Sequence, residues 1–307
     1  MRVIVTGGTG LIGRHVVNLL THDGHDVIVL SRNPQKKASK LPEDARIVKW
    51  DARTPDGWGH LLDADDVVIV NLAGENPVNW RWTDEHKHRV RESRLNATRA
   101  VLAAIDAAPH PPHALLQASA VGYYSSYADK PLDETYPPSE DWRGRVCVEW
   151  EGLARQAPIR TALLRIGLVL DQHGGALPPF LLAASLMGSR LGDGEQWLPW
   201  IHNYDVARAV RFLMHDQSAE GPFNLVSPNP VRNREFMQAV AHARGRATVF
   251  PVPGALLRLV MGEQAHVVLD SQRVLPERLI AAGFDFKYPQ VEHALGDILS
   301  EARHWEE

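Results

Sequence analysis

The sequence of 307 residues is poor in cysteine and in long apolar runs, and its charges nearly balance. The single cysteine, Cys147, excludes an internal disulfide framework and is typical of a reducing compartment. No apolar run approaches the roughly 20 residues that a transmembrane helix needs. The net charge of −4 gives no electrostatic basis for binding nucleic acid or an anionic membrane. Because a strand is predicted from Arg2 onward, no signal peptide is expected, and we expect a soluble, cytoplasmic protein.

The first twenty residues, MRVIVTGGTGLIGRHVVNLL, predict a buried strand, a glycine-rich turn and an amphipathic helix. A side chain at Gly7 would obstruct the turn, one at Gly10 would keep a pyrophosphate from the backbone, and one at Gly13 would separate helix and strand. The helix N-terminus then favours an anion. Ordinary strand–helix turns also use glycine, but this context predicts dinucleotide binding. The predicted binding residues are Gly7, Thr9, Gly10, Leu11, Ile12 and Gly13.

Strand-like and helix-like runs alternate over the first half of the chain. This alternation predicts the α/β class, with a Rossmann-type doubly wound parallel sheet. The clearest helix is expected from Thr83, as N-cap, through Ile105. The pattern is looser beyond residue 170, so we expect a dinucleotide-binding domain over residues 1–170, to which 200–226 return, and a smaller, mainly substrate-binding lobe over 171–307. The predicted strands are Arg2–Thr6, Asp26–Leu30, Arg46–Val48, Asp66–Val70, Ala114–Gln117 and Thr161–Arg165.

The second predicted strand ends without the acid that NAD-binding folds usually place there for the adenosine ribose. Its end carries Ser31 and Arg32 instead. A hydroxyl and a guanidinium suit the 2′-phosphate of NADP(H), because arginine offers a planar pair of donors. A solvated arginine in the turn before Pro34 is the alternative. The sequence therefore predicts NADP(H) in preference to NAD(H).

An ordered series of motifs runs along nearly the whole chain. The motifs are TGGTGLIG (6–13), SR (31–32), NLAGE (71–75), SR (93–94), ASAVGYY (118–124), LRIGLVL (164–170), WIH (200–202), PFN (222–224) and SQRVLP (271–276). With these motifs the sequence resembles the extended short-chain dehydrogenase/reductase superfamily. Within it, the chain is similar to the atypical epimerase family proteins of the YfcH type. These resemble NAD-dependent epimerases and dehydratases and carry a C-terminal segment of unassigned function, DUF1731-like, here at about residues 250–300.

The resemblance implies cofactor-binding residues beyond the glycine-rich turn. Leu72, Ala73 and Gly74, after the fourth strand, would pass along the ribose and adenine side of the cofactor. Arg94, on the following helix, would approach the cofactor phosphates; an exposed helix charge is the alternative. The resemblance further places the pair at positions 166–167, Ile166 and Gly167, beside the nicotinamide.

The resemblance also implies active-site and substrate residues. Ser119 matches the serine that hydrogen-bonds the reacting oxygen, although a strand-end hydroxyl can instead satisfy backbone groups. Glu75 sits where a carboxylate could face substrate, or it is a solvated loop acid. The remaining residues implied at the substrate are Arg165 and His202.

The tyrosine and lysine that usually exchange the proton in this superfamily are missing. Counting from Ser119 and from Glu151 places Arg143 and Cys147 at their positions. Three replacement groups are considered. Either phenol of the pair Tyr123 and Tyr124 would act if an arginine depressed its pKa, and the Cys147 thiol would react only beside positive charge. Packing tyrosines and a buried, inert thiol are the alternatives.

Two functions remain open at this point. The first is an NADP(H)-dependent oxidoreductase or nucleotide-sugar epimerase acting on a carbonyl compound or a sugar nucleotide, with Ser119 holding the oxygen. The second is a non-catalytic NADP(H)-binding regulatory protein that acts through a protein partner. The missing pair favours the second function. Ser119 and four tryptophans expected near one cleft favour the first; ordinary packing is the alternative for these tryptophans, which are Trp80, Trp82, Trp197 and Trp200.

Partners other than a small molecule find little support in the sequence. Fifteen histidines invite a metal site, but those at positions 86, 88, 110 and 113 lack a recognised ligand spacing, so no metal is predicted. Neither nucleic acid nor a membrane is an expected partner. A homodimer is suggested only weakly by the sequence.

Overall fold

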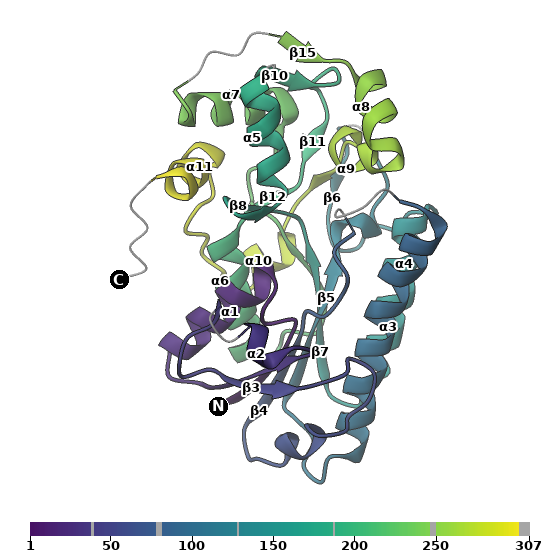
Figure 1. Ribbon diagram of the computed structural model, residues 1–307, viewed down its shortest axis with the longest axis vertical. Helices are drawn as coiled ribbons and strands as arrows, with labels where there is room; N and C mark the ends of the chain where they lie inside the picture. The colour runs from purple at the N-terminus through teal and green to yellow at the C-terminus, as the bar shows by residue number, and fades with distance from the viewer. Residues whose placement is uncertain (38–39, 78–81, 128, 187, 246–249, 301–307) are drawn as a thin grey trace.

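A seven-stranded parallel sheet forms the centre of the larger part of the molecule (Figure 1). The computed structural model describes residues 1–37, 40–77, 82–127, 129–186, 188–245 and 250–300. In sheet order the strands are β13 (Gly221–Leu225), β7 (Arg160–Ile166), β5 (Ala114–Ala120), β4 (Val67–Asn71), β1 (Arg2–Thr6), β2 (Asp26–Ser31) and β3 (Arg46–Lys49). The order changes direction between β1 and β4, and at such a point the carboxyl ends of the strands leave room for a ligand.

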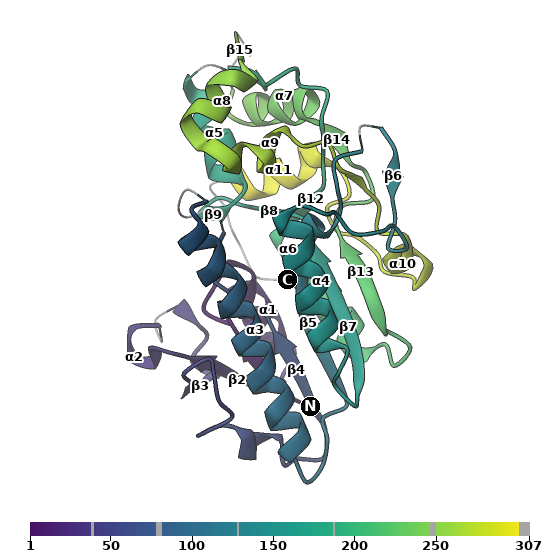
Figure 2. The ribbon, with the colours of Figure 1, turned by 90° about the vertical axis from the view of Figure 1, so that its right-hand side faces the viewer.

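Helices cover both faces of this sheet, which explains why its inner strands are mostly apolar. Helices α1 (Leu11–His22) and α6 (Asn203–His215) pack together on one face. Helices α3 (Asp84–Ala107) and α4 (Trp142–Ala154) pack together on the other face, which is turned toward the viewer in Figure 2. The predicted Rossmann-type doubly wound sheet is therefore confirmed.

The predicted elements agree with the structure to within a few residues. Helix α3 begins after Thr83, whose side chain accepts a hydrogen bond from the backbone N–H of His86. Strand β5 continues to Ala120, three residues beyond the predicted end, and therefore includes Ser119. Strand β13 returns to the sheet beside β7, so a segment late in the chain completes the sheet.

The smaller part of the molecule has its own apolar core, which contains Phe180 and Phe236. Its helices are α5 (Leu177–Leu186), α7 (Asn233–Ala243), α8 (Gly254–Met261), α9 (His266–Leu269) and α11 (Val291–Leu299). Its strands are β8 (Leu168–Asp171), β9 (Gly174–Gly175), β10 (Gly188–Leu191), β11 (Trp197–Leu198), β12 (Trp200–His202), β14 (Val231–Arg232) and β15 (Phe250–Val252). These strands make three small sheets above the carboxyl edge of the main sheet (Figure 1).

Short elements complete the described chain. They are α2 (Pro34–Lys37), β6 (Pro131–Leu132), β16 (Arg273–Val274), α10 (Glu277–Ala281) and 3₁₀ turns at Gly59–Leu62, Val121–Tyr123 and Gly262–Ala265. Strand β16 pairs with β6, and α10 packs against β13. Within the described residues, no helix has both the length and the apolar character needed to cross a membrane.

Candidate functional site

The glycine-rich turn between β1 and α1 brings three backbone segments closer together than side chains would allow. Gly7 has φ +67°, and a Cβ there would lie 2.6 Å from the carbonyl oxygen of Leu72. A Cβ at Gly13 would lie 2.3 Å from the carbonyl oxygen of Gly7, so α1 packs directly on the turn. Gly10 immediately precedes α1, and because it has no side chain it leaves the first backbone N–H groups of that helix uncovered. The turn therefore fits a dinucleotide pyrophosphate.

Buried polar side chains hold the strand ends around the turn. The Thr6 hydroxyl donates to Asn71 Oδ1 and accepts from the backbone N–H of Ala73 at 3.1 Å. Asn71 Nδ2 donates to Gln117 Oε1 at 2.8 Å, which joins β4 to β5. These bonds fix the Leu72–Gly74 segment beside the glycines. In the sequence, the residues that make these bonds were recognisable as polar residues at or next to the end of each apolar strand.

The end of β2 offers a cation without a counter-ion. Ser31 is buried, and its hydroxyl accepts from the backbone N–H of Asn33 at 3.3 Å. Arg32 is exposed, and it makes no hydrogen bond or ion pair with any other residue in the described part of the chain. An arginine in this position fits the 2′-phosphate of NADP(H).

Ser119 belongs to a buried ionic cluster. Its hydroxyl donates to Glu151 Oε1 at 2.7 Å, and Arg165 donates to the same carboxylate through Nε at 2.8 Å and Nη2 at 2.9 Å. All three side chains are at most 4% exposed. Burial disfavours the Arg165 charge, but its bonds to Glu151 prevail and raise its pKa. Glu151 was missed as a site residue, although it lies four residues after Cys147 and hence on the same face of α4.

The Arg165 guanidinium is engaged within the protein on its other edge as well. Its Nη1 donates to the Tyr124 hydroxyl at 2.8 Å and to the carbonyl oxygen of Glu134 at 3.1 Å. The guanidinium also covers the Tyr123 ring at 3.5 Å. The substrate role predicted for Arg165 thus stays a prediction, while its hydrogen bonds hold the cluster together.

Tyr124 is unsuited to the proton exchange considered for it. Its hydroxyl donates to Asn224 Oδ1 at 2.7 Å, and its ring is fully buried. Burial raises the pKa of Tyr124 far above its usual value, and the nearby Arg165 offsets this only in part. The arginine that was expected to depress the phenol's pKa is therefore present, but desolvation outweighs it. Tyr123 is partly buried beside it.

Arg143 and Cys147, which counting along the sequence placed at the positions of the missing tyrosine and lysine, both lie on α4. Arg143 Nη2 pairs with Asp141 at 2.7 Å and with Asp270 at 2.5 Å. Burial opposes its charge, but these carboxylates raise its pKa, so it cannot donate a proton. Burial and the charge of Glu151 raise the pKa of Cys147 to about 11. The thiol is therefore neutral at physiological pH.

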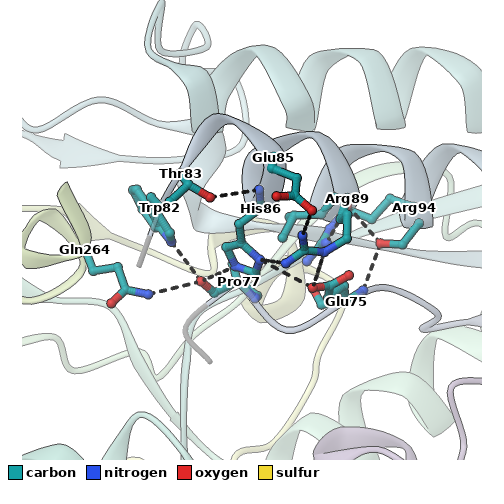
Figure 3. A network of polar contacts seen from close by, with 11 residues as sticks. Glu75, Pro77, Trp82, Thr83, Glu85, His86, Arg89, Arg94 and Gln264 are labelled. Atoms are coloured by element: carbon teal, nitrogen blue, oxygen red, sulfur yellow. Dashed lines mark hydrogen bonds and ion pairs between the residues drawn. The ribbon is translucent and has the colours of Figure 1, made fainter. Parts of the chain in front are cut away.

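Gly74 and Glu75 follow β4 and run along α3. Arg94 on α3 lies against Gly74, where a Cβ would meet its side chain at 3.2 Å, and donates through Nη1 to the carbonyl oxygen of Glu75 at 2.9 Å. The Glu75 carboxylate lies 3.3 Å from His86 Nδ1 and 3.4 Å from Arg89 Nε (Figure 3), and its charge also stabilises the charged form of Arg94.

The carbonyl oxygen of Pro77 anchors the same loop. It accepts from Trp82 Nε1 at 2.8 Å, from His86 Nε2 at 3.3 Å and from Gln264 Nε2 at 3.4 Å (Figure 3). Lys87 adds an ion pair with Glu263 at 2.5 Å. The loop after β4 is therefore tied both to α3 and to the C-terminal part of the chain.

The remaining predicted residues lie farther along the chain. Ile166 ends β7, and a Cβ at Gly167 would lie 2.2 Å from the carbonyl oxygen of Pro199. His202 is buried; its Nδ1 caps α6 by accepting from the N–H of Tyr204, and its Nε2 lies 3.2 Å from Asp297 Oδ2. The ring thus joins α6 to α11, and its substrate role stays a prediction.

Those of the four tryptophans that the structure describes do not share one environment. Trp200 is buried in the smaller core, whereas Trp82 and Trp197 are partly buried, and Trp80 lies outside the described residues. The guanidinium carbons of Arg232 and Arg273 lie 4.7 and 4.9 Å from the centre of the Trp197 ring. Over the described ranges, no three His, Cys, Asp or Glu side chains gather closely enough to hold a metal ion.

Residues 3–226 match the NAD dependent epimerase/dehydratase family, and residues 252–298 match a domain of unknown function, DUF1731. An epimerase family protein of Staphylococcus epidermidis is 37% identical over 307 residues, covering 97% of this chain and 99% of the relative. One from Staphylococcus aureus is 35% identical over 305 residues, with the same coverage.

Solved structures show the same relationship. The human epimerase family protein SDR39U1, crystallised with NADPH, is 33% identical with a TM-score of 0.87, covering 98% of this chain and all of the human chain. A nucleoside-diphosphate sugar epimerase from Corynebacterium glutamicum is 30% identical with a TM-score of 0.76. The match covers 97% of this chain and 58% of the Corynebacterium glutamicum chain.

Proposed function

Because the chain belongs to the NAD dependent epimerase/dehydratase family, we propose that it binds NADP(H) and acts as an oxidoreductase or epimerase. Its substrate would be a carbonyl compound or a sugar nucleotide. The observation that supports NADP(H) as the cofactor is Arg32, which lies next to Ser31 and forms no ion pair with any residue that the structure describes. NAD(H)-binding folds usually have an acidic residue at this position. The human neighbour with NADPH supports the same choice.

The chain's own residues would bind and orient the cofactor along the carboxyl edge of the sheet. The glycine-rich turn would hold the pyrophosphate, Arg32 the 2′-phosphate, and the Leu72–Gly74 segment the ribose. A bound nicotinamide supplies hydride transfer. We place this cofactor in residues 1–170 with 200–226, and the substrate mainly against 171–307. We further propose a cytoplasmic protein and a homodimer.

Ser119 would hold the reacting oxygen. Because its hydroxyl proton is donated to Glu151, its oxygen is free to accept a hydrogen bond from a substrate hydroxyl. Arg165 keeps the Glu151 carboxylate charged and in place, so the serine has one preferred orientation. This arrangement favours recognition of an alcohol that loses hydride, or of the hydroxyl of a sugar.

The lack of a usual proton donor in the site favours a second function, which is cofactor binding without catalysis. Arg143 and the neutral thiol of Cys147 replace the usual tyrosine and lysine, and burial keeps Tyr124 a weak acid. These features suit a non-catalytic NADP(H)-binding protein that regulates a protein partner.

A turnover assay separates the two functions. We expect the absorbance of reduced nicotinamide to change when the protein meets a panel of alcohols, carbonyl compounds and sugar nucleotides, and Ser119→Ala should abolish that change. Epimerisation returns the hydride and leaves the absorbance constant, so sugar-nucleotide reactions are also analysed for product. Tight NADP(H) binding without turnover of any member would favour the regulatory function.

A further inference from the structure

We propose that residues 262–269 act as a strap that holds the loop after β4 in place and slows the release of NADP(H). The strap consists of the 3₁₀ turn Gly262–Ala265 and helix α9, and it lies within the match to the domain of unknown function. The described part of the loop comprises residues 72–77. This inference rests on the proposed NADP(H) binding, and it makes Glu263 and Gln264 positioning residues.

The loop after β4 is attached to different parts of the molecule at its two ends. Near its start, the backbone N–H of Ala73 donates to the Thr6 hydroxyl at 3.1 Å, which ties the loop to the main sheet. At Pro77, the carbonyl oxygen accepts from Gln264 Nε2 at 3.4 Å and from two side chains near the start of α3 (Figure 3). The segment proposed to hold the ribose therefore belongs to a loop that the strap reaches.

The strap has a second attachment on the helix that follows this loop. Lys87 Nζ, on α3, lies 2.5 Å from Glu263 Oε2. The Glu263 side chain is 58% exposed, so water competes for this ion pair. An ion pair of this kind contributes little to global stability. It would therefore break and re-form while the rest of the protein stays folded.

The chain on the two sides of the strap is held with different firmness. After the strap, Gln272 is buried, and its Nε2 donates to the carbonyl oxygens of Val121 at 3.2 Å and Tyr124 at 2.7 Å. Val274, in β16, is fully buried. Before the strap, α8 leaves the Leu259 side chain 76% exposed. The strap would thus move relative to a fixed β16.

Gly262, between α8 and the strap, is suited to be the hinge of this movement. Its φ of +61° lies in the region that favours glycine, and a Cβ there would meet no atom of the described residues within 4 Å. Hinges commonly lie at the ends of elements, where a few residues absorb the change in backbone angles.

The strap affects cofactor release through the loop that it holds. A Cβ at Gly7 would lie 2.6 Å from the carbonyl oxygen of Leu72, so the loop adjoins the glycine-rich turn. A cofactor on that turn would be bordered by the loop, which must keep its position for the ribose contacts to persist. Because loop opening sets the release rate in many enzymes, loss of the strap contacts is expected to speed dissociation.

Stopped-flow measurement of NADPH release, with excess NADP⁺ as the competitor, tests the strap. We expect Glu263→Gln and Gln264→Ala each to speed release about twofold to fivefold. Lys87→Met should match Glu263→Gln, and the double variant should be no faster than either, because all three remove the same ion pair. Glu149→Gln, which removes an exposed ion pair between α4 and α3, should release NADPH at the wild-type rate.

Hydrogen exchange, measured by mass spectrometry on the cofactor-free proteins, reports the strap itself. Glu263→Gln should speed exchange in residues 262–269 and 72–77 together, while β1 exchanges as in wild type. This pattern separates a local attachment from a general loss of structure.

The results that would overturn the strap are specific. They are unchanged NADPH release in both Glu263→Gln and Gln264→Ala, additive effects of Lys87→Met and Glu263→Gln, or faster exchange confined to residues 262–269. If wild type does not bind NADPH, the proposed function and the role in release are both wrong. Hydrogen exchange then still decides whether the strap holds the loop.

Discussion

Arg165 donates to both oxygens of Glu151 and to the phenol oxygen of Tyr124, so the hydrogen bonds of one buried guanidinium orient the groups around Ser119. The pair is shielded from water, and its charges depend on one another. Removing one member leaves the other as an uncompensated buried charge. At the scale of residues, the site therefore combines a fully paired buried charge, Arg165, with an exposed arginine, Arg32, that forms no ion pair among the described residues.

Glu151→Gln is expected to lower the free energy of unfolding by about 3 kcal/mol, because it leaves the Arg165 charge unpaired in the interior. Urea denaturation measures the change. Glu149→Gln, on the exposed side of the same helix, should change it by less than about 1 kcal/mol. Equal effects of the two substitutions would show that the buried ion pair contributes no more to the free energy of unfolding than the exposed one.

The Cys147 thiol gives a pH-dependent prediction. Its pKa is about 11 in the folded protein and 9.0 without that environment. The folded state therefore holds this proton more tightly, and its contribution to stability is complete below pH 9 and declines as the pH rises from 9 toward 11. The expected loss is roughly 2–3 kcal/mol. It is measured as the difference in unfolding free energy between wild type and Cys147→Ala across this range; parallel curves would contradict it.

The junction of β1 and α1 is the element that places the cofactor, and two helical glycines test it. Gly13→Ala puts a Cβ 2.3 Å from the Gly7 carbonyl oxygen, so α1 must move. We expect a loss of about 1–3 kcal/mol in unfolding free energy together with weaker NADPH binding. Gly152→Ala, on α4 with no atom within 4 Å of its Cβ, should instead gain about 0.5–1 kcal/mol. Thermal melts compare the two; matching signs would refute the packing argument.

The elements also show how far local sequence patterns determine this fold. The apolar runs of β1, β2 and β4 and the Thr83 cap of α3 were readable because burial and capping act on neighbouring residues. Two ion pairs could not be predicted from the sequence, because their partners lie far apart along the chain. Glu151 and Arg165 are 14 positions apart, and Arg143 and Asp270 are 127 positions apart. The pKa direction of Tyr124 depended on burial, which spacing alone does not reveal.

At the scale of the whole molecule, the segment that matches the domain of unknown function contacts the larger part of the molecule at several places. Its strand β16 pairs with β6, and Arg278 on α10 donates to the carbonyl oxygen of Pro222 at 2.7 Å beside β13. Asp270 pairs with Arg143 at the start of α4. This segment is thus part of the support for the candidate site.

Recognition of NADP(H) through Arg32 is tested most directly by equilibrium titration of wild type and Arg32→Ala with NADPH and with NADH. We predict that wild type binds NADPH more tightly than NADH, because a charge-assisted contact to phosphate contributes roughly 1.5–3 kcal/mol. Arg32→Ala should lose that preference without losing NADH affinity, and Arg99→Ala, an exposed arginine on α3, should retain it. Equal affinities of wild type for NADPH and NADH would contradict the assignment.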